Sequence, residues 1–347
     1  PPMSRADGTP TNAVFGFTNM LIKLIDDLKA DHCAIIFDTA RKTFRNDIFD
    51  QYKANRPPAP EELIPQFSII REAVNAFNVP CIEMDGFEAD DLIASYTTLA
   101  VNDGAKVTIV SSDKDLMQLV GHNVMMHDPM KNRYIGVSEV REKFGVNPDK
   151  VIDVQSLAGD SADNVPGVPG IGIKTAAQLI TEYGDLDSLL ARATEITQPK
   201  RKENLINFSE MARISRDLVT LKTDVEVPRP LQSLAVANFD PNTVLEFLRA
   251  QGFKRLTARF ETEAETQNIS NRSQGITSNE PAINYQLVQD IEILEQWLSE
   301  IKETGIVAFD TETNSLNATQ ASLVGISFAI SDGRACYIPL RHKCLSQ

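Results

Sequence analysis

The fold class rests on the stretch Lys106-Val-Thr-Ile-Val110 and on Ser111-Ser-Asp-Lys-Asp115, which follows it. A short apolar run that ends in small polar and acidic residues is typical of a buried parallel strand. A second run of this kind, Cys33-Ala-Ile-Ile-Phe37, ends at Asp38. Helical patterns of apolar residues flank both runs, at about 11–30, 61–77, 88–101, 138–144 and 149–158. The alternation predicts an α/β domain with a doubly wound, mostly parallel sheet, whose site lies at the carboxyl ends of the strands.

The rest of the chain changes character twice. Beyond about residue 165 the strand signals fade and the pattern is helical up to about residue 261. Residues 262–282 are rich in Glu, Thr, Asn, Ser and Gln, which is a linker composition. A helical pattern and the apolar run Gly305-Ile-Val-Ala-Phe309 come after it. We expect an α/β core over 1–164, a helical subdomain over 165–261, a linker over 262–282 and a partial α/β domain over 283–347.

Composition limits the class of protein. The 347 residues carry 34 basic and 48 acidic side chains, a net charge of −14, which at first sight disfavours a nucleic-acid partner. Carboxylates gathered around metal ions lower the net charge without making the working surface acidic, so such a partner stays possible. The cysteines at 33, 81, 336 and 344 have no paired spacing, which excludes a disulfide scaffold and a cysteine zinc site. No apolar run approaches the ~18 residues that cross a bilayer, and we expect a soluble, cytoplasmic protein.

Acidic residues recur after the predicted strands and in nearby turns: Asp38, Glu88, Asp90, Asp91, Asp113, Asp115, Asp160 and Asp163. Gathered in one cleft, these like charges would repel one another unless cations lay among them. Oxygen ligands select hard cations, so the pattern predicts Mg²⁺ or Mn²⁺, and two ions ~4 Å apart would serve phosphodiester hydrolysis. Each piece alone has another interpretation, because acids also cap helices and Asp160 with Asp163 also fits a turn.

A hairpin rich in glycine and proline leads into a predicted helix, with the sequence Val165-Pro-Gly-Val-Pro-Gly170-Ile-Gly172-Ile-Lys174-Thr-Ala. Gly170 and Gly172 allow close backbone approach, and the amides of the first helical turn can hold a phosphate. Lys174 adds positive charge at the same place. A tight turn between two helices would have a similar sequence, and this alternative stays open.

Basic and aromatic residues interleave over residues 41–56. The basic ones are Arg41, Lys42, Arg45, Lys53 and Arg56, and the aromatic ones are Phe44, Phe49 and Tyr52. This mixture suits a surface that stacks bases and grips phosphates along a single strand, although a solvated helix face would also explain it. The polar and proline-rich residues 56–59 that follow suggest an exposed excursion above the sheet.

These motifs together resemble a known family. They read F-D-T-A-R-K-T-F-R at 37–45, Y-K-A-N-R-P-P at 52–58, G-F-E-A-D-D at 86–91, S-D-K-D-L at 112–116 and G-D-S-A-D-N-V-P-G-V-P-G-I-G at 159–172. Over about residues 1–260 the chain resembles the 5′-nuclease domains of the flap endonuclease family, of the type that begins bacterial DNA polymerase I. The resemblance implies a helical arch at about 41–60, through which a 5′ single strand passes, and a helix-hairpin-helix that grips duplex DNA.

The resemblance also implies roles for individual residues. Asp38, Glu88 and Asp90 would hold one metal ion with Asp91 close by, and Asp113, Asp115, Asp160 and Asp163 would form the second metal site. Lys53, Arg56 and Arg45 would position the scissile phosphate. DNA contacts would come from Arg41, Lys42, Phe44, Tyr52, Gly167, Gly170, Gly172, Lys174 and Thr175. A K⁺ ion often lies at the family's hairpin.

Residues 283–340 resemble the start of a 3′–5′ proofreading exonuclease domain, whose first metal-binding pair matches Asp310 and Glu312 in F-D-T-E-T. The family begins with a strand that carries a further metal-binding Asp, and this chain opens at Pro1-Pro-Met-Ser, just after that point. We therefore expect a fragment, shortened at both ends and without polymerase activity.

The resemblance predicts a monomeric bacterial 5′–3′ exonuclease and flap endonuclease that acts on DNA with a 5′ flap, a nick or an RNA primer. A non-catalytic module that binds branched DNA is the alternative, because the first strand and its Asp are missing. A third possibility is a compact RNA-cleaving α/β nuclease with similar acidic clusters. The hairpin and the basic stretch disfavour it, because the compact enzymes lack both.

Overall fold

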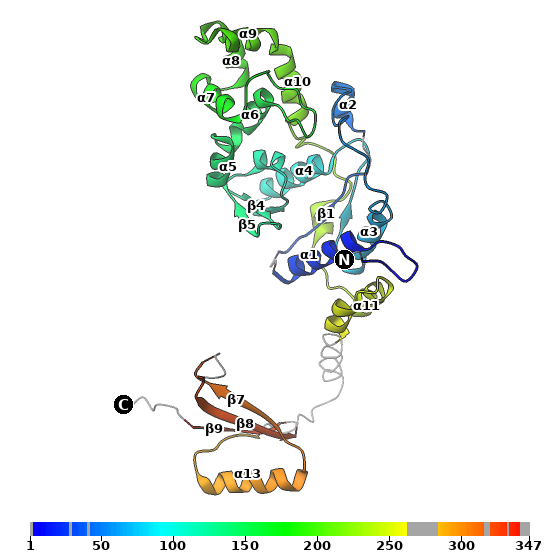
Figure 1. Ribbon diagram of the computed structural model, residues 1–347, viewed down its shortest axis with the longest axis vertical. Coiled ribbons are helices and arrows are strands. Elements are labelled where there is room, and N and C mark those ends of the chain that lie inside the picture. Colours follow the sequence, from blue (N-terminus) through cyan, green and yellow to red (C-terminus); the bar gives the residue numbers. More distant parts are fainter. Residues whose placement is uncertain are drawn as a thin grey trace, which may run out of the picture. The chain divides into compact units, whose positions relative to one another are not determined.

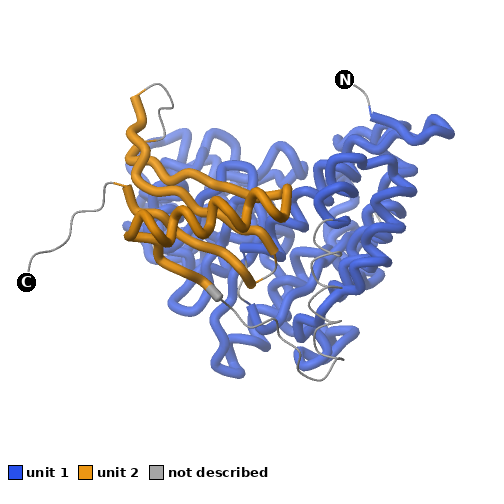
Figure 2. Tube along the Cα trace, turned by 90° about the horizontal axis from the view of Figure 1, so that it is seen from below, with its two compact units in different colours: residues 1–264 blue, residues 265–347 orange. Residues whose placement is uncertain are grey.

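The computed structural model describes residues 3–27, 30–39, 42–261, 284–315, 320–331 and 333–340. The chain forms two compact units, Pro1–Ala264 and Glu265–Gln347 (Figure 2). The expected linker at 262–282 lies outside the described residues. Within the described part of the chain, no helix has both the length and the apolar character needed to cross a membrane.

Unit 1 is mostly helical (Figure 1). Its helices are α1 (Asn12–Asp27), α2 (Phe44–Ile48), α3 (Gln66–Ala76), α4 (Ala89–Asn102), α5 (Val137–Phe144), α6 (Val151–Ala158), α7 (Ile173–Tyr183), α8 (Leu186–Ala191), α9 (Pro199–Asn207), α10 (Ser209–Val219) and α11 (Pro241–Ala250). Short 3₁₀ helices connect some of them. One of these, η1 (Asp115–Leu119), begins at the last residue of the acidic stretch 111–115. The helical patterns seen in the sequence therefore form helices in the structure.

The strands of unit 1 form two separate sheets. Strand β1 (Ile35–Ile36) pairs in parallel with β2 (Cys81–Ile82). Strand β3 (Val107–Val110) pairs in parallel with β4 (Val124–Asp128), which pairs antiparallel with β5 (Arg133–Ile135). The α/β class and the parallel pairing are confirmed, but the single doubly wound sheet is not observed. Strands β1 and β2 are only two residues long, and the described residues include no strand that joins them to β3.

The hydrophobic core of unit 1 has two main parts. The larger extends from β3, β4 and β5 into the helices α5 to α9, with Met126, Phe144, Leu157 and Leu186 among its fully buried side chains. The second joins α1, α3, α11 and the helical residues 254–261. Helix α6 packs against α7 and α10, so the sheet and the helical region share one core across the expected boundary at 164/165.

The basic stretch at 41–60 contains little helix. Helix α2 covers five residues, and turns follow at 50–55 and 61–65. Two of its side chains, those of Arg45 and Tyr52, are buried against other segments and hold the stretch down. Pro57, Pro58 and Pro60 then prevent helix formation. Over residues 42–60, in which the resemblance implies a helical arch, the structure thus shows one short helix, a turn at 50–55 and otherwise irregular chain.

In its described residues, unit 2 contains a four-stranded sheet and one helix, with strand order β6-β9-β8-β7. The strands are β6 (Asn284–Leu287), β7 (Ala308–Thr313), β8 (Leu323–Ser331) and β9 (Arg334–Pro339), and the helix is α13 (Ile291–Thr304). Trp297 of α13 packs with Val288, Cys336 and Ile338 in a small core. The expected partial α/β domain therefore contains a mixed sheet, in which only the β6–β9 pair is parallel.

Candidate active site

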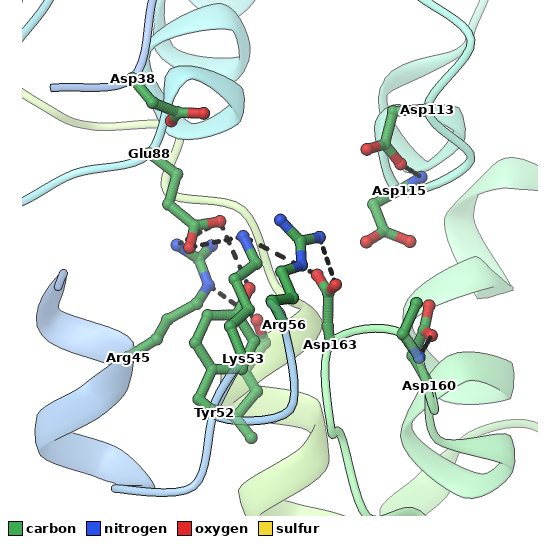
Figure 3. Close-up of polar contacts among 12 residues, drawn as sticks. Asp38, Arg45, Tyr52, Lys53, Arg56, Glu88, Asp113, Asp115, Asp160 and Asp163 are labelled. Carbon is green, nitrogen blue, oxygen red and sulfur yellow. Dashed lines mark hydrogen bonds and ion pairs between the residues drawn. The ribbon is translucent and has the colours of Figure 1, made fainter. Parts of the chain in front are cut away.

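Acidic and basic side chains of unit 1 meet in one cleft of about 120 Å³ (Figure 3). The carboxylates that line it are Asp38, Glu88, Asp90, Asp113, Asp115 and Asp163, and the cations are Arg45, Lys53 and Arg56. Asp38 follows β1, and Asp113 follows β3, so both acids come from the carboxyl ends of strands. The structure thus gathers residues that are up to 125 positions apart in the chain, from Asp38 to Asp163.

Helix α4 positions the acids on one side of the cleft. Glu88 is its N-cap residue, and the Asp38 carboxylate accepts a hydrogen bond of 2.8 Å from the backbone N–H of Ala89. A carboxylate is favoured at a helix N-terminus by the free N–H groups and the helix dipole. Burial raises the pKa of Asp90 to about 8, together with repulsion from Asp113, Glu88, Asp38 and Asp115. Without a counterion, this arrangement of carboxylates is electrostatically unfavourable.

Arg45 and Asp91 form a buried ion pair, which differs from the roles expected for them. Arg45 Nη1 and Nη2 donate to Asp91 at 2.6 and 2.8 Å, and Arg45 Nε donates to the carbonyl of Leu218. Arg45 is 1% exposed and Asp91 0%. Asp91 also accepts from the backbone N–H groups of Glu88 and Lys222. Both side chains are already saturated by protein partners, so they fasten α2 to α4 and to the segment after α10 rather than meeting a phosphate or a metal ion.

Lys53 and Arg56 are the cations that reach the open cleft. Lys53 Nζ lies 2.8 Å from Glu88 Oε1 and 3.8 Å from Asp163 Oδ2, and Arg56 pairs with Asp163. The Lys53 side chain is 21% exposed and that of Arg56 51%. Tyr52, expected to contact DNA, is instead buried, and its hydroxyl donates to Glu88 Oε2 at 3.3 Å. In this position Tyr52 holds the Glu88 carboxylate in place, and its buried ring is not available to stack on a base.

The turn after β3 holds the acids on the other side. The backbone N–H of Asp113 donates to Ser111 Oγ, and the N–H of Asp115 donates to Asp113 Oδ1 at 2.9 Å. Asp115 Oδ1 also accepts a bond of 2.6 Å from Gln155 Nε2 on α6. Burial and the nearby Asp113 raise the pKa of Asp115 to about 6, against the opposing effect of the Gln155 bond. Sequence reasoning missed Gln155, because nothing in the local sequence connects α6 with this turn.

The loop 159–167 carries Asp160 and Asp163. It closes on itself through paired hydrogen bonds between Asp160 and Val165. Gly159 and Gly167 both have positive φ and touch so closely that a Cβ on either would lie 2.5 Å from backbone. Gly167 is buried here, so its expected DNA contact is replaced by a packing role. Asp160 pairs with Lys114, and this ion pair lowers the pKa of Asp160 against the effect of burial.

Family comparisons match the chain over nearly its whole length. A model of the 5′-3′ exonuclease N-terminal resolvase-like domain matches residues 1–145, the 5′-3′ exonuclease C-terminal SAM fold matches 146–242, and a 3′-5′ exonuclease model matches 285–347. A 5′-3′ exonuclease of Aquifex aeolicus is 36% identical over 258 residues, which cover 74% of this chain and 87% of that protein. The chain belongs to the 5′-3′ exonuclease family.

Longer relatives and a solved structure agree with this membership. DNA polymerase I of Rhizobium leguminosarum is 44% identical over 423 aligned positions, which take in 99% of this chain and 42% of that protein. The chain thus spans less than half the length of this relative. The phage T5 D15 protein, co-crystallised with metal ions, has a TM-score of 0.55 at 21% identity, over 72% of this chain and 90% of that one. The family expected from the motifs is confirmed, and so is the α/β class with a helical subdomain.

In this chain the other expected DNA contacts are not among the residues that line the cleft. Gly172 is the N-cap of α7, and Gly172 and Lys174 are exposed, whereas Thr175 is half-buried. Gly170 has a φ of +78° and approaches the amide of Asn204. Lys42 is exposed, and the half-buried Phe44 lies between the cations of Arg45 and Lys222. Arg41 lies outside the described residues.

In unit 2, Asp310 and Glu312 occupy alternate positions of β7, opposite Ser327 and Gly325 of β8. All six residues of β7 are exposed. Among the described residues of the chain, no three His, Cys, Asp or Glu side chains converge tightly enough, as they lie, to hold a metal ion. The carboxylates of unit 1 share a cleft, but cationic side chains engage Glu88, Asp160 and Asp163 within it or beside it.

Proposed function

We propose that this chain is a metal-dependent 5′ nuclease that hydrolyses phosphodiesters in DNA with a 5′ flap, a nick or an RNA primer. One observation carries the proposal: carboxylates from two strand ends share a single cleft with the part-exposed cations Lys53 and Arg56. Acids alone would repel a phosphodiester, and cations alone would bind it without cleaving it. The phage T5 D15 flap endonuclease, whose fold resembles this one, has been crystallised with DNA and metal ions, which supports the same substrate class here.

The donor set of the cleft fits hard divalent cations. It consists of carboxylate oxygens, which Mg²⁺ and Mn²⁺ prefer as ligands. The raised pKa values of Asp90 and Asp115, which come from burial and from repulsion by neighbouring acids, support a cation between these carboxylates. Asp38, Glu88 and Asp90 would hold one ion, and Asp113 and Asp115, with Asp163 or Asp160, would hold the second. Bound ions would supply an activated water and stabilise the leaving oxygen.

The cations of the cleft would orient the substrate. In the present arrangement Lys53 bonds Glu88 and Arg56 bonds Asp163 (Figure 3). Divalent ions at these carboxylates would compete with both contacts and free the two cations for the scissile phosphate. Arginine and lysine would there balance the negative charge that develops on the phosphate oxygens. Tyr52 and the Arg45–Asp91 pair would keep Glu88 and the first turn of α4 in place.

The hairpin before α7 would hold duplex DNA away from the cleft. The N–H groups of an eleven-residue helix start at Gly172, beside the exposed Lys174. Such a helix N-terminus favours a phosphate. Gly170 and Gly172 leave the backbone accessible there, and backbone oxygens of this hairpin would hold a K⁺ ion. We further propose that the protein acts as a monomer in the bacterial cytoplasm, close to the chromosome.

A second candidate function is binding of branched DNA without cleavage. The observation that favours it is the lack of three convergent metal ligands among the described residues, together with the cations that already engage Glu88, Asp160 and Asp163. Such a module would grip a flap substrate through Lys53, Arg56 and Lys174. It would respond to salt but not to divalent ions.

The experiment that separates the two uses a 5′-labelled flap duplex with Mg²⁺, with Mn²⁺ or with EDTA. A nuclease releases a short labelled product with either ion and none with EDTA. A binding module retards the same duplex in a gel under all three conditions and releases no product. A duplex of the same sequence without the flap serves as the structural control.

A further inference from the structure

Gln155 of α6 contacts the acidic turn after β3 through a single strong bond. Its Nε2 donates to Asp115 Oδ1 at 2.6 Å, although the two residues are 40 positions apart. The residue is 3% exposed, and its neighbours Val154 and Leu157 belong to the main core. Its other amide atom, Oε1, is buried and has no hydrogen-bond partner among the described residues.

Two other glutamines, the buried Gln66 and the half-buried Gln118, form hydrogen bonds with the backbone alone. Gln66 accepts from the N–H groups of Ala13 and Val14 and donates to the carbonyl of Glu62. Gln118 donates to the carbonyls of Asp115 and Val219 and accepts from the N–H of Leu221. Both amides use both ends, and only with backbone. Gln155 instead leaves one end unsatisfied, which costs ~1–3 kcal/mol for a buried polar group, and directs the other end at a carboxylate.

The orientation of the Gln155 amide is fixed by this carboxylate. An amide turned the other way would place Oε1 against Asp115 Oδ1, and two acceptors so close would repel each other. With Nε2 against Oδ1, the bond fixes the rotation of the Asp115 side chain, which lines the cleft. Asp115 is also joined to Asp113 through its backbone N–H, so one bond from α6 orients the whole acidic turn.

We propose that Gln155 is a positioning residue for a divalent cation at Asp113 and Asp115. The inference rests on the proposed function, because it assigns the ion to these two acids. Partners behind a metal ligand orient the ligand, and removing one of them typically weakens metal binding ~10–100-fold. Gln155 would act in this way through Asp115 without touching the ion or the DNA.

Binding of Mn²⁺ to the full chain, followed by electron paramagnetic resonance without DNA, tests the proposal. Gln155→Leu keeps an apolar side chain of comparable volume in the core and removes the donor. We expect its Mn²⁺ dissociation constant to rise ~10-fold and its melting temperature in EDTA to stay within a few degrees of the wild type, because the unsatisfied Oε1 disappears with the bond. The Mg²⁺ concentration for half-maximal flap cleavage should rise in parallel, while the rate at saturating Mg²⁺ recovers.

Gln66→Met is the matched control, because it removes a buried amide that bonds only backbone. It should lower the melting temperature and leave Mn²⁺ affinity unchanged. Gln155→Met repeats the test with an unbranched side chain if the leucine variant does not fold. Wild-type Mn²⁺ affinity in both Gln155 variants would overturn the inference and leave the proposed function standing. A wild-type chain that binds no Mn²⁺ and cleaves no flap would overturn both.

Discussion

The cleft of unit 1 and strand β7 of unit 2 begin from the same sequence pattern and differ in what surrounds it. Each has two acids separated by one residue beside an apolar run, Asp113 and Asp115 in one case and Asp310 and Glu312 in the other. In unit 1, Asp38, Glu88, Asp90 and Asp163 join the pair in a cleft. In unit 2 the pair lies on a fully exposed strand, opposite Ser327 and Gly325.

The difference shows that the acid pair is only a starting point for a site. In unit 1 three other segments bring four further carboxylates, and burial with mutual repulsion raises the pKa of Asp90 to about 8. A cation is strongly favoured in such a place. The pair on β7 is exposed, so water solvates both acids. The same substitution in each of the two pairs therefore tests whether metal binding requires the surrounding cleft as well as the acid pair.

The largest effect is expected for Asp113→Asn compared with Asp310→Asn. Loss of a metal-binding carboxylate should slow Mg²⁺-dependent flap cleavage by at least ~10³-fold, equivalent to ~4 kcal/mol of transition-state stabilisation. Flap binding should persist or tighten, because a negative charge is removed near the DNA. Asp310→Asn should leave both properties unchanged. Cleavage rates and gel retardation with one labelled flap compare the two variants. Equal losses in both would contradict a functional difference between the cleft and β7.

The next effect concerns the two arginines of the cleft. Arg45→Met leaves Asp91 charged and buried without its partner, which typically costs ~3–5 kcal/mol. Arg56→Met removes a half-exposed side chain and should cost under ~1 kcal/mol of stability while slowing cleavage at least ~10-fold. Urea unfolding in EDTA and cleavage rates in Mg²⁺ separate the two. If Arg45→Met were stable but inactive, Arg45 would act on the phosphate as the family resemblance implied.

Sequence reasoning found the acids of the cleft because strand ends and acidic turns are local signals. Asp38, Asp113 and Asp115 needed only the apolar runs before them, and Glu88 only the helix that it caps. The burial of Arg45, Tyr52 and Gly167 could not be predicted in this way. Each depends on a segment distant in the chain, such as Leu218 for Arg45, so a basic or aromatic residue in an apparently exposed stretch became buried.

The strands β2, β4 and β5 were not predicted from the sequence, and only β2 lacks a local signal. β2 has only two residues and no pattern of its own. β4 and β5 do have a signal, because Val124 and Met126 alternate with more exposed residues and Asp128-Pro-Met marks the turn. The stretch at 41–60 was expected to form an arch from resemblance, and Pro57, Pro58 and Pro60 explain only why its last residues are not helical.

A smaller effect is expected in the pH dependence of stability without metal ions. The pKa of Asp90 sets its sign. The pKa of Asp90 is about 8 in the folded protein against 3.8 for an ordinary Asp, so between these values the folded state binds more protons than the unfolded state. Stability therefore falls as the pH rises from 4 to 8. Asp90→Asn should match the wild type near pH 4 and be ~1–3 kcal/mol more stable near pH 8 in EDTA. Asp310→Asn should follow the wild-type curve at every pH, and a pH-independent gain for Asp90→Asn would contradict the repulsion among the cleft acids.

The smallest effect separates DNA binding from the chemistry of the cleft. Lys174 is exposed at the start of α7, and Lys302 is exposed in the last turn of α13 in unit 2. If Lys174 contacts one duplex phosphate, Lys174→Ala should weaken binding a few-fold for all sequences and reduce the slope of log affinity against log salt by about one, because one fewer counterion is released. Lys302→Ala should change neither. Binding isotherms at several salt concentrations, in EDTA so that no DNA is cleaved, give both slopes. An unchanged slope for Lys174→Ala would mean that the hairpin is only a turn between helices, and the cleft would then hold the DNA through Lys53 and Arg56 alone.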